Sequence, residues 1–151
     1  MKKYTVLLVL FFTFTFSSKA NPNNSLLKDT IPIVNYNDIA ITGKVFDTVE
    51  TEASFRGDTE AWVSFLQTNL KPGVPVKKKA PAGLYTVMVQ FIVDKEGRLS
   101  DIKALTNHGF GMEKEVIRVL KKSPRWEPAI MKGEKVKAYR KQPISFSIKE
   151  I

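Results

Sequence analysis

The chain has 151 residues, of which 43% are apolar and 26% are charged, and this length and composition predict one globular domain with a leader or tail. It contains no cysteine and one histidine, His108. This excludes disulfides, thiolate metal sites and a cysteine nucleophile, and it leaves a single imidazole for any catalytic triad or metal site. We therefore expect no enzyme activity, no metal and no cofactor.

The first 20 residues have the pattern of an export signal. Two lysines precede an apolar run over residues 4–16, and the small residues Ser18 and Ala20 stand three and one positions before Asn21, as a signal peptidase requires. As a helix, this run is shorter than the roughly 30 Å hydrocarbon core of a bilayer. The pattern predicts cleavage before Asn21 and a mature chain in the periplasm; the alternative is a retained inner-membrane anchor.

Charge is distributed unevenly along the mature chain. Residues 21–70 carry 3 basic and 7 acidic side chains, whereas residues 71–151 carry 18 basic and 8 acidic ones. The C-terminal part therefore has a strong positive field. Export separates the protein from the genome, so we expect no nucleic acid as a partner, and the alternative is a basic surface that is only solvated.

The lead-in and the first elements follow the leader. Residues 21–44 are predicted to be a flexible lead-in, and the domain is predicted over residues 45–151, with a short strand near 39–49. Asp58 precedes an apolar stripe typical of a capped helix over residues 59–70. Residues 71–83 contain three prolines and three consecutive lysines, which predicts an exposed basic loop. These lysines, Lys77, Lys78 and Lys79, either contact an anionic membrane surface weakly or are simply solvated.

A β-hairpin is the clearest local signal. Residues 86–94 alternate so that four apolar side chains point to one side of a strand, and residues 99–106 return as a second strand after a turn that contains Gly97. The four side chains are those of Val87, Val89, Phe91 and Val93. Nearby, Asp94, Glu96 and Asp101 form an acidic cluster that we interpret as part of a solvated turn rather than a calcium or acid–base site.

A second helix and a third strand complete the predicted fold. An apolar stripe over residues 112–120 predicts the helix, and residues 136–148 predict a strand with Pro143 inside it. The order of these elements, helix, hairpin, helix and strand, predicts an α+β fold in which two helices pack on one face of a small, about three-stranded antiparallel sheet. Because the hairpin strands already pair, the third strand is expected outside one of them, with an unpaired edge.

The region from 87 to 148 contains a strand that ends in FIVDKEG, then GFGMEKEV, PRWEPA, and GEKV followed by PISF. These motifs give the region a resemblance to the C-terminal domain of TonB-family energy transducers of the type found in Bacteroidetes. The positions that carry it are Phe91, Gly97, Gly111, Pro124, Trp126, Pro128, Gly133, Val136 and Phe146. It implies a periplasmic domain that binds the TonB box, a short extended segment of an outer-membrane receptor, by adding it as a strand.

The expected function is therefore a non-enzymatic binding module that supports TonB-dependent transport across the envelope. Its edge on the third strand would give main-chain hydrogen bonds and side-chain selectivity. The partner-binding residues that we expect there are Lys137, Tyr139, Arg140, Lys141, Ser145 and Ser147. The expected partner is an outer-membrane receptor or another envelope protein. The alternative is a structural or regulatory envelope protein with the same fold and no energy coupling, which pairs with a second copy through edge strands.

Overall fold

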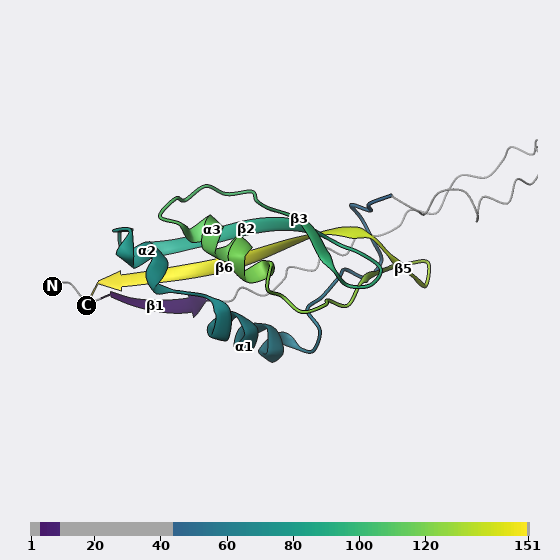
Figure 1. Cartoon of the computed structure of the whole chain (residues 1–151), viewed down its shortest axis with the longest axis horizontal. Coiled ribbons are helices and arrows are strands. Elements are labelled where there is room, and N and C mark those ends of the chain that lie inside the picture. Colours follow the sequence, from purple (N-terminus) through teal and green to yellow (C-terminus); the bar gives the residue numbers. More distant parts are fainter. Residues whose placement is uncertain (1–3, 10–43, 151) are drawn as a thin grey trace, which may run out of the picture. The chain divides into compact units, whose positions relative to one another are not determined.

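The computed structural model describes residues 4–9 and 44–150. Its centre is an antiparallel sheet with the strand order β1-β6-β2-β3 (Figure 1). These strands are β1 (Tyr4–Val9), β6 (Ala138–Glu150), β2 (Gly83–Val93) and β3 (Leu99–Ala104). The hairpin β2–β3 and the position of the last strand outside it, against β2, agree with the sequence prediction. The predicted number of about three strands was too low, because residues from the leader add β1 on the far side of β6.

The core lies against one face of this sheet. The four alternating apolar side chains of β2 are fully buried, and Ile144, Phe146 and Ile148 of β6 join them from the neighbouring strand. Burial follows the two-residue period of a strand, so one face of each strand carries the core. The odd-numbered residues of β6 have the opposite orientation, which determines the surface described below.

Two amphipathic helices complete the core. Helix α1 (Thr59–Asn69) begins at Asp58, whose carboxylate accepts a hydrogen bond from the backbone of Ala61 at 2.8 Å, as predicted for a capping residue. Helix α3 (Met112–Leu120) buries its apolar stripe in the same cluster as Leu66 of α1. The fold is therefore α+β with an antiparallel sheet, as the sequence predicts.

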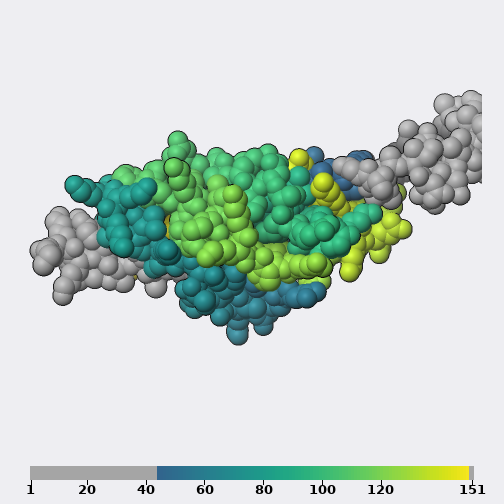
Figure 2. Space-filling model, in the orientation of Figure 1, coloured from purple at the N-terminus to yellow at the C-terminus, as the bar shows by residue number. Residues whose placement is uncertain are grey.

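A buried carboxylate joins the two helices. Glu115 of α3 is 5% exposed and accepts hydrogen bonds from the backbone of Lys71, at 2.7 Å, and from Arg118. Arg118 in turn donates a hydrogen bond, at 2.6 Å, to the carbonyl of Asn69 in the last turn of α1. Figure 2 shows the teal surface of α1 adjoining the green surface of α3. The network ties the C-terminal end of α1 to α3 by charged hydrogen bonds, which are stronger than neutral ones.

Three local predictions need correction. Residues 71–83 are not a loop throughout: α2 (Gly73–Lys77) forms there, with Pro75 buried, although the three lysines are exposed. The third strand starts later than residue 136, because Val136 belongs to the separate hairpin of β4 (Ala129–Met131) and β5 (Glu134–Val136). The strand expected near 39–49 does not form over residues 44–49, where only Phe46 makes a bridge, and residues 39–43 lie outside the described residues.

The turn of the β2–β3 hairpin is locked against Trp126. The Trp126 N–H donates to the carbonyl of Gly97 at 2.8 Å, and a Cβ at position 97 would lie 2.0 Å from the Trp126 carbonyl oxygen. Gly97 also has a φ of +79°, which favours glycine. The indole of Trp126 is 2% exposed and contacts Phe91 edge-on, with a centroid distance of 5.0 Å. The large aromatic side chain of Trp126 therefore fixes the Pro-Arg-Trp-Glu-Pro segment to the core.

Candidate partner-binding edge

The outer edge of β6 presents the backbone of every second residue. The carbonyl of Met88 accepts a hydrogen bond from Leu105 on the β3 side, so the pair Met88 and Pro143 does not exchange hydrogen bonds between β2 and β6. The backbone of Pro143 therefore points outward. Tyr139 follows the same parity and donates its N–H outward to the carbonyl of Phe46 at 2.9 Å. The odd-numbered residues of β6 thus form the edge at which another strand can pair.

Half of this edge already carries a strand. Strand β1 pairs antiparallel with residues 145–150, with Val9 opposite Ser145, Leu7 opposite Ser147 and Thr5 opposite Lys149 (purple beside yellow in Figure 1). The sequence predicted an unpaired edge on the last strand. That expectation is corrected here, since the apolar run of the leader, kept in the chain, covers it.

Between the two pairings, Lys141 and Pro143 present the outward backbone groups of β6. A proline supplies a carbonyl but no N–H, so its missing donor falls on the edge and not in the ladder with β2. The side chain of Lys141 is exposed. The middle of the edge is therefore poorer in donors than the part from 145 to 150.

Five of the six predicted binding residues share one face of β6. Lys137, which precedes β6, and Tyr139, Lys141, Ser145 and Ser147 have odd numbers, so their side chains point away from the helices. Ser145 is buried on that face, and its hydroxyl lies 2.9 Å from the hydroxyl of Thr86 on β2. Ser145 thus links the two strands and offers a partner its backbone rather than its side chain.

Arg140 is the exception, and its predicted role at the edge needs correction. It has the parity of the core residues, its side chain is 12% exposed, and it forms an ion pair with Glu52. Burial lowers the pKa of its guanidinium, and within the part of the chain that the structure describes its Nε has no hydrogen-bond partner. Arg140 therefore ties the segment before α1 to β6. The alternation of β6 itself, with Ile144 and Phe146 inward, was the signal that could have identified this orientation.

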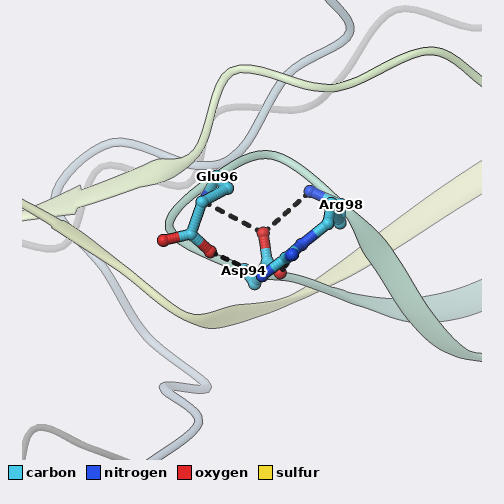
Figure 3. Close-up of polar contacts among 3 residues, drawn as sticks. All are labelled: Asp94, Glu96 and Arg98. Atoms are coloured by element: carbon cyan, nitrogen blue, oxygen red, sulfur yellow. Dashed lines mark hydrogen bonds and ion pairs between the residues drawn. The ribbon is translucent and has the colours of Figure 1, made fainter.

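The acidic cluster at the hairpin turn holds the turn together (Figure 3). The Asp94 carboxylate accepts hydrogen bonds from the backbones of Glu96 and Arg98, at 3.0 and 2.8 Å, and from the Arg98 side chain at 2.7 Å. Burial alone would raise the pKa of Asp94, but the bonds from Arg98 outweigh it and lower that pKa. Over residues 4–9 and 44–150, no group of histidine and acidic side chains is arranged to hold a metal ion. The geometry supports the interpretation of Asp94 and Glu96 as turn residues, whereas Asp101 lies in β3 and pairs with Lys103 at 3.4 Å.

His108 closes the other edge of β2. Its Nε2 donates to the carbonyl of Thr86 at 2.8 Å, and its backbone N–H donates to Glu113 at 2.6 Å. A carbonyl can only accept, so Nε2 carries the proton. This bond satisfies the backbone of β2 where β3 has already ended. The role of His108 is therefore structural.

One of the comparisons with known proteins found a match. No helix among the described residues is long and apolar enough to cross a membrane. Residues 85–148, from β2 to β6, match the family model for the C-terminal domain of the Gram-negative bacterial TonB protein. Neither the curated proteins nor the solved structures with which the chain was compared gave a match. The chain therefore carries, over residues 85–148, a domain of the TonB C-terminal family.

Proposed function

We propose that this protein is a periplasmic, non-enzymatic module that binds a TonB-box-like segment of an outer-membrane receptor as an added strand on β6. The observation that carries the proposal is the pairing of β1 with residues 145–150, because it occupies the outward hydrogen-bonding groups that an incoming strand would use. The family match supports an envelope role. Strand addition then supports TonB-dependent transport.

The leader determines when this edge is available. Cleavage before Asn21 would remove β1 and expose the outward backbone of Ser145, Ser147 and Lys149. A chain that keeps residues 1–20 would have to exchange β1 for the receptor segment. The intact mass of the exported protein measures which form exists, and a mass that includes Met1 restores the anchored alternative.

Titration of the mature chain, starting at Asn21, with peptides of six or seven residues from candidate receptors tests the proposal. So short a segment buries less than the roughly 1,200 Å² of a standard interface, so we expect micromolar or weaker affinity. Amide chemical shifts should change along residues 141–149. Shifts confined to the Lys77–Lys79 run, or none at saturation, would reject the edge in favour of a structural or lipid-facing role.

A matched pair of variants separates main-chain binding from side-chain binding. Ser147→Pro removes one outward donor and leaves the ladder with β2 intact, a substitution that Pro143 at the same parity already shows to be tolerated. Losing one hydrogen bond of about 1 kcal/mol should weaken peptide binding about fivefold, whereas Ser147→Ala should leave it unchanged. Equal effects of both variants would contradict strand addition. Concentration-dependent dimerisation, without any peptide binding, would favour the pairing of two copies through this edge.

A further inference from the structure

A small cavity lies at the opposite side of the sheet from the β6 edge. It measures about 220 Å³ and lies between the hairpin turn, β3 and the connection from α3 to β4. Its lining residues are Gly97, Arg98, Leu99, Ile102, Leu120, Lys121, Ser123, Pro124 and Arg125. Because β2 separates β3 from β6, an occupant of this cavity and a strand on β6 would not compete.

The walls of the cavity are fixed by hydrogen bonds. The backbone of Trp126 bonds to Gly97 at 2.8 Å, which joins the hairpin turn to the opposite wall. The indole Nε1 of Trp126 donates to the Ser123 hydroxyl at 2.8 Å, and the Ser123 N–H donates to the Leu120 carbonyl at 3.0 Å. A site held in this way loses little conformational entropy when it binds a ligand.

Two kinds of side chain line the cavity. Leu99, Ile102 and Leu120 are apolar and at least half buried, whereas Lys121 and Arg125 are exposed cations. No acidic group among the described residues forms an ion pair with either cation. Arg98, the third cation of the lining, already bonds to Asp94 and Glu96 at 2.7 and 2.9 Å. The free positive charge therefore belongs to Lys121 and Arg125, beside an apolar wall.

We propose that this cavity binds the terminal residue of a peptide, with its apolar side chain against Leu99, Ile102 and Leu120 and its α-carboxylate on Lys121 and Arg125. A volume of about 220 Å³ is below the roughly 300–1,000 Å³ of drug-sized sites, and it suits one amino-acid residue. A guanidinium binds the planar carboxylate through two hydrogen bonds. Inorganic phosphate would leave the apolar wall unused. The proposal is independent of strand addition on β6.

N-acetyl-leucine, N-acetyl-leucine amide and inorganic phosphate are the probes, each titrated into the ¹⁵N-labelled mature chain at low ionic strength. We expect saturable amide shifts at Gly97, Leu99, Lys121 and Arg125 with N-acetyl-leucine. The neutral amide, which lacks the charge-assisted bonds, should bind about tenfold more weakly. Equal binding of the acid and the amide would overturn the carboxylate assignment. Phosphate binding as tight as that of N-acetyl-leucine would reduce the site to a general anion site, and the absence of saturable shifts would overturn it altogether.

Two exposed cations of the same loop provide the matched variants. Arg125→Gln removes a cation of the lining, and we expect N-acetyl-leucine to bind about tenfold more weakly. Lys122→Gln removes an equal charge next to Lys121 but outside the lining, and it should leave the affinity unchanged. An equal loss in both variants would indicate long-range attraction instead of a site. Both side chains are exposed, so neither substitution is expected to unfold the domain.

Discussion

Neutralising Glu115 should destabilise the domain, although Glu115 belongs to α3 and not to the proposed binding edge. In Glu115→Gln the side chain keeps its shape but loses its charge and brings an NH₂ group among donors. In the wild-type protein, the Lys71 N–H and the Arg118 guanidinium donate hydrogen bonds to the Glu115 carboxylate, at 2.7 Å for Lys71 and 2.8 Å for the Arg118 Nε. A hydrogen bond to a charged group contributes about 1.5–3 kcal/mol to stability, and Arg118 remains partly solvated. We therefore expect the free energy of unfolding to fall by about 2 kcal/mol.

Urea and thermal unfolding of the mature chain measure this loss. For a domain of roughly 100 residues, 2 kcal/mol corresponds to a decrease in Tm of about 8–16 °C. Glu60→Gln is the control, because Glu60 is an exposed acid in the first turn of α1, and we expect a change below about 0.5 kcal/mol. If the two variants unfolded at the same urea concentration, the network would not stabilise the fold.

The same carboxylate gives the stability a pH dependence of known sign. Burial would raise the pKa of Glu115, but the hydrogen bonds from Arg118 and Lys71 outweigh it, and the folded pKa lies below the usual value. A lowered folded pKa contributes stability that is complete above the unfolded pKa and is lost as pH falls toward the folded pKa. The difference between wild type and Glu115→Gln should therefore be largest near neutrality and shrink below about pH 4. A difference that stayed constant down to acid pH would refute the assignment.

Three further tests, each by chemical denaturation, examine the hairpin turns and the core. Gly97→Ala should lower the free energy of unfolding by more than about 3 kcal/mol, because its Cβ would overlap the Trp126 carbonyl. Gly133 has a similar φ of +77° but open space around it, so Gly133→Ala should lower the free energy of unfolding by only about 1 kcal/mol. Trp62→Phe should lower the free energy of unfolding less than Trp126→Phe does. The reason is that the Nε1 of Trp62 is buried without a hydrogen-bond partner among the described residues, while the Nε1 of Trp126 bonds to Ser123. Equal losses in the two variants would contradict this reasoning. Phe91→Ala should cost about 3–5 kcal/mol, and a value near 1 kcal/mol would mean that the core rearranges to fill the cavity.

Local patterns in the sequence were sufficient for most of the secondary structure. The alternation of Val87, Val89 and Phe91 predicted β2, and Asp58 predicted where α1 begins, because each signal depends on a few neighbouring residues. Topology followed in part, since a strand that comes after a completed hairpin has only the outside positions left. The prediction missed α2, because this helix is short and proline-rich and gives little local signal. Its stability comes from tertiary contacts such as the burial of Pro75.

The candidate site was predicted less completely than the fold. The sequence determined that β6 has one apolar and one polar face, but this alternation was not applied to Arg140, which was predicted at the edge together with the five outward residues. Only the tertiary structure decided that Arg140 pairs with Glu52, 88 positions earlier in the chain, and that β1 covers residues 145–150. The reason is physical: a backbone period of two residues is set locally, whereas the partner of a strand edge or of a buried charge is chosen by the free energy of the whole folded chain.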